Sequence, residues 1–141
     1  MSIDGLADTD LRTILGTTRR VAVMGASAKP DRASFYVAAF LAEKGITIIP
    51  VNPGLAGQSL HGQAAVATLA EAAPLDMVYI FRAAEAAGVV ADEAIALGAQ
   101  TIWLPLDVIN QEAAARGRAA GLQVVMDRCA KVEWARLGLP A

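Results

Sequence analysis

The residues between positions 25 and 34 combine small side chains with two positive charges and two hydroxyl groups. The segment reads Gly25-Ala26-Ser27-Ala28-Lys29-Pro30-Asp31-Arg32-Ala33-Ser34. Small residues let a backbone approach an anion closely, and free N–H groups at the start of a helix attract negative charge. Lys29 and Arg32 could neutralise further charge, and Ser34 could cap the helix or bond a phosphate oxygen. The segment therefore predicts an anion site, with a plain glycine turn bearing solvated charges as the alternative.

Three further loops each follow a strongly apolar run. They are Val51-Asn52-Pro53-Gly54, Phe81-Arg82 and Leu104-Pro105-Leu106-Asp107. In an open parallel sheet, ligands bind beyond the carboxyl ends of the strands, where the strand order reverses. We therefore expect these loops to lie with the segment 25–34 around one ligand.

The pattern of glycines and acids disfavours a nicotinamide or flavin dinucleotide. The G-x-G-x-x-G fingerprint requires glycine where this chain has Ser27 and Pro30. The acid that would bind a ribose after the second strand is also missing, because that stretch reads Pro50-Val51-Asn52-Pro53. An ADP-type ligand with an additional phosphate remains compatible with both departures.

The single cysteine and the single histidine limit the chemistry of the chain. One cysteine excludes an intrachain disulfide and a cysteine metal cluster, and one histidine excludes a histidine-rich metal site. Cys129 is interpreted as a packed thiol in preference to a redox partner activated by Arg128 and Lys131. His61 has no acidic residue nearby in the sequence to orient it, so we interpret it as a loop histidine.

The composition predicts one globular domain spanning residues 1–141. Of the 141 residues, 55% are hydrophobic and 18% charged, which excludes a disordered chain. The formal net charge of −2 shows no basic excess, so we expect no nucleic-acid partner. The chain begins without a basic and apolar leader, and no apolar run reaches the roughly 18–20 residues that span a bilayer. We expect a soluble, cytoplasmic protein with no membrane partner.

Five apolar runs alternate with segments of helical spacing. The runs, predicted to be strands buried on both faces, are residues 21–24, 46–49, 77–81, 101–104 and 122–126. The predicted helices are residues 8–16, 34–44, 68–72, 85–97, 111–120 and 130–137, with a loop over 51–63. Gly45, Gly98 and Gly121 each stand between a helix and a strand, where a left-handed glycine ends a helix. This alternation predicts an α/β fold of three layers with a five-stranded, mostly parallel sheet.

Four motifs in this order resemble a known family. They are Gly25-Ala26-Ser27 with Lys29-Pro30, then Ile49-Pro50-Val51-Asn52-Pro53-Gly54, then Ile80-Phe81-Arg82, then Met126-Asp127-Arg128-Cys129. Together they resemble the small stand-alone CoA-binding domain proteins, which are similar to the nucleotide-binding domain of the succinyl-CoA synthetase alpha subunit. The resemblance covers a core of about residues 12–137.

The resemblance implies a Rossmann-like domain with coenzyme A lying across the strand ends. It places the phosphates against Gly25-Ala26-Ser27, with Lys29 and Arg32 meeting their charge. Asn52 and Pro53 would shape the adenosine side, and Phe81 and Arg82 would line the cleft. The family tends to read Trp-x-Gln-x-Gly where this chain has Trp103-Leu104-Pro105-Leu106-Asp107. Because Pro105 removes a donor and Asp107 adds a negative charge, contacts to the pantetheine arm would be altered.

We therefore expect a protein that binds coenzyme A or acyl-CoA and has no evident catalytic residues. The alternatives are an acyl-CoA-handling enzyme or enzyme subunit that uses Cys129, a regulatory interaction protein, and an NADP-type enzyme in which Arg32 meets a 2′-phosphate. The apolar C-terminal helix could pack on its own sheet or on a second subunit, so a homodimer is a further alternative. We also expect Gly25→Val to reduce ligand binding more than it reduces folding, because a branched side chain would block a phosphate.

Overall fold

The structure, a computed structural model, describes residues 3–140. The main sheet is formed by β1 (Arg20–Met24), β2 (Thr47–Val51), β5 (Met77–Ile80), β6 (Thr101–Trp103) and β7 (Gln123–Val125). The helices are α1 (Asp8–Thr17), α2 (Ala33–Glu43), α3 (Leu69–Ala72), α4 (Ala84–Ala96), α5 (Gln111–Ala119) and α6 (Ala130–Arg136). Every predicted strand and helix is present, and the ends differ by one or two residues.

All neighbouring strands of the main sheet run parallel, in the order β2-β1-β5-β6-β7. The chain first builds outward from β1 to β2 and then crosses to the other side of β1 to form β5. The strand order therefore reverses between β1 and β5, and this is the point where such sheets bind ligands. The predicted α/β class with a five-stranded sheet is confirmed, and each pairing in that sheet is parallel.

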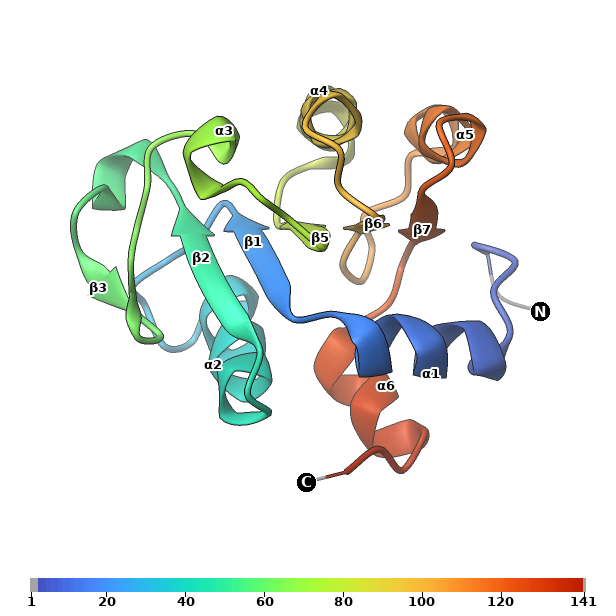
Figure 1. Cartoon of the computed structure of the whole chain (residues 1–141), viewed down its shortest axis with the longest axis horizontal. Helices are drawn as coiled ribbons and strands as arrows, with labels where there is room; N and C mark the ends of the chain where they lie inside the picture. The colour runs from blue at the N-terminus through green and yellow to red at the C-terminus, as the bar shows by residue number, and fades with distance from the viewer. Residues whose placement is uncertain (1–2, 141) are drawn as a thin grey trace.

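Helices cover both faces of the sheet, as Figure 1 shows. Helices α1, α2 and α6 lie on one face, and α3, α4 and α5 lie on the other. Alternate residues of each strand belong to two separate hydrophobic cores. Val23 and Tyr79 pack toward α2 and α6, whereas Ala22 and Val78 pack toward α3 and α4. Because both faces are buried, the strands read as continuous apolar runs without alternation. The three-layer, Rossmann-like arrangement follows from that burial.

The connection after β2 contains structure that the sequence did not predict. It begins with a 3-10 helix, η1 (Pro53–Leu55), followed by an antiparallel hairpin of β3 (Ser59–Leu60) and β4 (Gln63–Ala64). His61 and Gly62 form its turn, with φ of 53° and 83°. The connection predicted as a loop over 51–63 therefore contains a short helix and a hairpin. Two-residue strands lack an apolar pattern long enough to identify them.

Candidate functional site

A cavity of about 560 Å³ opens at the carboxyl ends of β1, β2 and β5, beside the first turn of α2. This is the edge where the strand order reverses. Nine of the thirteen predicted site residues line it: Gly25, Ala26, Ser27, Lys29, Arg32, Ser34, Asn52, Gly54 and Phe81. Ala28, Ala33 and Leu55 complete the lining and were not predicted. The two alanines lie inside the predicted loop, whereas Leu55 belongs to the unexpected η1.

The turn after β1 is packed against the protein's own backbone. Gly25 has φ +79°, and a Cβ atom there would overlap the carbonyl oxygen of Phe81. The N–H groups of Gly25 and Ala26 both donate to the carbonyl of Val51, at 3.1 and 3.4 Å. Glycine is therefore required at this position by the close approach of the β5 end, independently of any ligand.

The carboxamide of Asn52 joins this turn to the end of β2. Its Nδ2 donates to the carbonyl of Ala26 at 2.8 Å, and its Oδ1 accepts from the N–H of Gly54 at 2.9 Å. One partner accepts and the other donates, so only this orientation of the amide satisfies both. Asn52 thus connects two of the loops that line the cavity.

The first turn of α2 presents polar groups that have no hydrogen-bond partner among the described residues. Arg32 occupies the N-cap without a side-chain capping bond. Of the two roles predicted for Ser34, the structure therefore excludes the helix cap, and a bond to a phosphate oxygen stays a prediction. Ser34 lies inside the first turn, is 6% exposed, and its hydroxyl makes no hydrogen bond to any described residue. Within residues 3–140, the N–H groups of Ala33 and Ser34 also lack acceptors, which is usual at a helix start.

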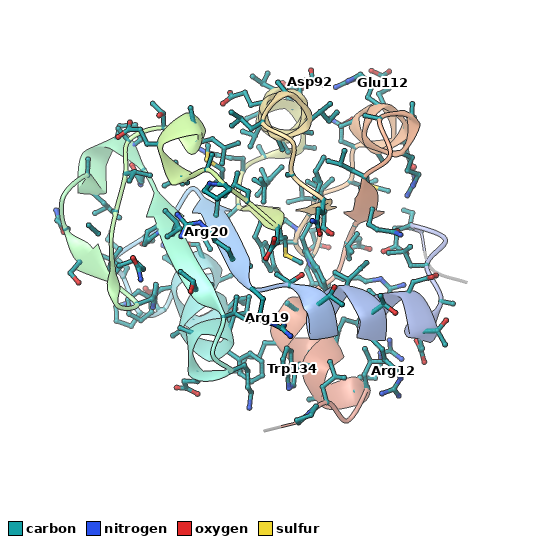
Figure 2. The ribbon with its side chains drawn as sticks, in the orientation of Figure 1. Arg12, Arg19, Arg20, Asp92, Glu112 and Trp134 are labelled. Atoms are coloured by element: carbon teal, nitrogen blue, oxygen red, sulfur yellow. The ribbon has the colours of Figure 1, made fainter. Side chains whose placement is uncertain are left out.

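Three basic side chains at the cavity make no ion pair, hydrogen bond or ring contact to other described residues: Lys29, Arg32 and Arg82. Arg82 follows β5 and reaches over the turn, with its Nε 3.5 Å from where a Cβ of Gly25 would stand. Every other lysine and arginine has such a partner, including Arg12, Arg19 and Arg20, which are labelled in Figure 2. Positive charge without a protein partner is therefore concentrated at this cavity.

The remaining predicted residues lie outside the cavity lining. Pro53 is exposed at the start of η1, and Arg82 borders the lining without belonging to it. Leu104 is fully buried in the core, and Pro105 after it is half-buried. Asp107 adopts φ +68°, and its N–H donates to Oδ1 of Asp127 at 2.7 Å. The loop after β6 is thus held against the loop after β7.

Cys129 lies at the N-terminal end of α6 and is half-buried against the core. The guanidinium of Arg128, which the alternative of a redox-active thiol requires, is directed elsewhere: it contacts Asp4 at 2.7 Å and Glu133 at 2.9 Å. The ammonium of Lys131 lies over the ring of Tyr36. Both cations proposed to assist the thiol therefore have other partners.

His61 packs edge-on against Phe35 in the first turn of α2, with ring centroids 4.8 Å apart. Partial burial lowers the pKa of His61 below its ordinary value of 6.5. As the pH falls through about 6.5, His61 is therefore protonated more readily in the unfolded chain than in the folded one. The free energy of unfolding decreases as a result. The contact also joins the β3–β4 hairpin to the helix that begins beside the cavity.

We expect His61→Asn to remove part of the acid sensitivity of the protein. Asparagine tolerates the left-handed backbone at this turn but does not titrate. Thermal unfolding midpoints should be measured for both proteins at about pH 5.5 and 7.5, on either side of the unperturbed histidine pKa. The wild type should lose more stability on acidification than the variant. Equal losses would show that protonation of His61 does not contribute to the loss of stability at low pH.

Two negative findings apply to the described part of the chain. Among residues 3–140, no helix has the length and apolar character needed to cross a membrane. The same residues contain no group of three or more His, Cys, Asp or Glu side chains placed to hold a metal ion.

Comparison with known proteins identifies relatives across nearly the whole chain. Residues 19–135 match the family described as CoA binding domain. The uncharacterized protein YneT of Bacillus subtilis is 36% identical over 124 residues, which is 87% of this chain and 90% of that protein.

Solved structures agree with this match. A Thermus thermophilus protein, cell-free ID.343, is 36% identical with a TM-score of 0.88, over 94% of this chain and 99% of that one. A hypothetical protein from Pyrococcus horikoshii is 32% identical with a TM-score of 0.89, over 97% and 96% of the two chains. The resemblance inferred from the four motifs is confirmed, and the chain belongs to the CoA binding domain family.

Proposed function

We propose that this protein binds coenzyme A or an acyl-CoA, with the phosphate groups of the ligand in the cavity beside α2. The observation that carries the proposal is the position of Lys29, Arg32 and Arg82. The side chains of these cations have no partner among the described residues; Lys29 and Arg32 line the cavity at the strand-order reversal, and Arg82 borders it beside Gly25. A ligand with several negative charges would supply the missing partners.

The charge distribution of coenzyme A suits this site better than that of NAD. Coenzyme A carries a 3′-phosphate in addition to its diphosphate, whereas NAD carries the diphosphate alone. Unbonded N–H groups at the first turn of α2 and the hydroxyl of Ser34, which lines the cavity, would bond phosphate oxygens. The residue after β2 is Asn52, where dinucleotide enzymes place a carboxylate for the ribose. Basic residues and the absence of that carboxylate both favour the more highly charged ligand.

Isothermal titration with coenzyme A, dephospho-coenzyme A, NADP⁺ and NAD⁺ tests the proposal. We expect coenzyme A to bind most tightly, and its affinity to fall as salt is added. Arg32→Gln and Arg82→Gln should each weaken coenzyme A binding by about 10- to 100-fold, since a hydrogen bond to a charged group contributes roughly 1.5–3 kcal/mol. No heat with coenzyme A or its dephospho form, or tighter binding of NADP⁺, would refute the proposal.

Arg116→Gln is the matched control for these charge changes. Arg116 pairs with Asp92 on the outer side of the α4–α5 layer and does not line the cavity. Figure 2 labels Asp92 on α4. The variant removes the same charge from the protein, so an equal loss of affinity would mean that net charge, not the cavity, determines binding.

A further inference from the structure

Asn52 stands at the one position where the chain could have carried a ribose-binding acid, and its side chain is instead engaged with the protein. Both ends of its carboxamide bond backbone groups, those of Ala26 and Gly54. Its backbone N–H donates to Val66, and its carbonyl accepts from Leu55. These hydrogen bonds hold both the backbone and the side chain of Asn52 in place without a ligand.

The bond to Ala26 determines the direction of the next amide. In a trans peptide the carbonyl and the following N–H point in opposite directions. With the carbonyl of Ala26 held toward Asn52, the N–H of Ser27 must point away from it. That N–H has no acceptor among residues 3–140, and Ser27 lines the cavity. The Ser27 N–H donor is thus held in one orientation, without an acceptor in the part of the chain that the structure describes.

We infer that Asn52 is a positioning residue for ligand binding, which acts by fixing the Ala26–Ser27 peptide so that the Ser27 amide is presented to an anionic group. This inference rests on the proposed function. It adds that the hydrogen bond from Asn52 keeps the turn at Ala26 and Ser27 in its binding conformation before the ligand binds. A loop that is already ordered loses less conformational entropy when a ligand binds. A carboxylate at position 52 would have no donor for Ala26, so holding the loop and binding a ribose with an acid are incompatible here.

Asn110 provides a matched control, because it makes the same two kinds of bond elsewhere. Its Nδ2 donates to the carbonyl of Ala84 at 2.9 Å, and its Oδ1 accepts from the N–H of Ala113 at 3.0 Å. It caps α5 and does not line the cavity. Asn110→Ala should therefore resemble Asn52→Ala in lost hydrogen bonds and differ from it in ligand binding.

The test combines calorimetric titration of coenzyme A with amide NMR spectra of the ligand-free proteins. Asn52→Ala should weaken coenzyme A binding by about 10-fold or more, the scale of one lost hydrogen bond, while Asn110→Ala stays within about twofold of the wild type. The Ser27 amide signal of the ligand-free protein should shift in Asn52→Ala and not in Asn110→Ala. Asn52→Asp keeps the acceptor for Gly54 but puts a negatively charged oxygen in place of the donor to Ala26, so it gives the same NMR test if the alanine variant fails to fold.

The affinities and the Ser27 amide signal together decide the inference. Unchanged affinity in Asn52→Ala, or an equal loss in Asn110→Ala, overturns the inference. Weakened binding with an unshifted Ser27 amide would mean that Asn52 contacts the ligand directly, which also overturns it. If the wild type does not bind coenzyme A, the proposed function fails, and the Ser27 amide alone then decides whether Asn52 holds the loop.

Discussion

Replacing Gly25 with alanine is expected to destabilise the folded protein by about 3 kcal/mol or more, because two costs combine at this position. The residue has φ +79°, a conformation that disfavours any Cβ atom, and that atom would also overlap the carbonyl oxygen of Phe81. Backbone atoms of a central strand end cannot move away as a flexible side chain can. The overlap involves only protein atoms, so it acts in the absence of ligand.

Gly98→Ala separates the two costs. Gly98 has nearly the same φ, +77°, but a Cβ atom there would have nothing within 4 Å. Its substitution should cost only the roughly 1–2 kcal/mol of a left-handed residue. Urea unfolding of both variants measures the difference, and similar losses would mean that the β5 carbonyl yields to a methyl group.

The close contact with Phe81 changes the role assigned to Gly25 in the Gly25-Ala26-Ser27 motif. The sequence suggested that Gly25→Val would reduce binding more than folding, since glycine was interpreted as space for a phosphate. The structure gives Gly25 a role in the fold: the end of β5 approaches β1 so closely that no side chain fits. Loss of binding in a Gly25 variant therefore cannot by itself locate the ligand, and the Arg32 and Arg82 variants are the better test.

Local patterns were sufficient to predict the architecture. Double-sided burial left continuous apolar runs such as residues 21–24, and the helices that cover them end at glycines with positive φ, including Gly45 and Gly121. The rule that ligands bind at carboxyl strand ends then selected the loops that border the cavity. These features depend on periodicity and chain order, which a single sequence records directly.

Contacts between distant residues could not be predicted in this way. Ser34 was expected to cap α2 or to bond a phosphate, but the cap position falls on Arg32, and Ser34 lies inside the first turn and lines the cavity. Leu104 follows a strand as the site residues do, yet it is fully buried in the core. The bond from Asn52 to Ala26 depends on the distance between two loops, which no pattern of residue types encodes.

The clearest case of a missed contact is the ion pair between Asp4 and Arg128, 124 residues apart in the sequence. Arg128 Nε lies 2.7 Å from Asp4 Oδ2, and the two side chains are 12% and 0% exposed. The same carboxylate accepts from the N–H of Met126, just after β7. The hydrogen bonds that the Arg128 guanidinium donates to Asp4 raise the pKa of Arg128 above its ordinary value, so the arginine remains charged. The N-terminal segment is thereby held against the carboxyl end of the sheet.

Asp4→Ala is therefore expected to cost about 3–5 kcal/mol, the range for removing one partner of a buried ion pair. The loss arises because a charged Arg128 and the Met126 N–H would remain inside the protein with a partner removed. Asp4→Asn should cost less, since its carbonyl oxygen still accepts from Met126. Asp92→Ala is the control: its pair with Arg116 is 55% and 46% exposed, so its loss should cost under about 1 kcal/mol. Urea unfolding of the three variants tests this order, and an Asp4→Ala variant as stable as Asp92→Ala would show that the ion pair with Arg128 does not stabilise the fold.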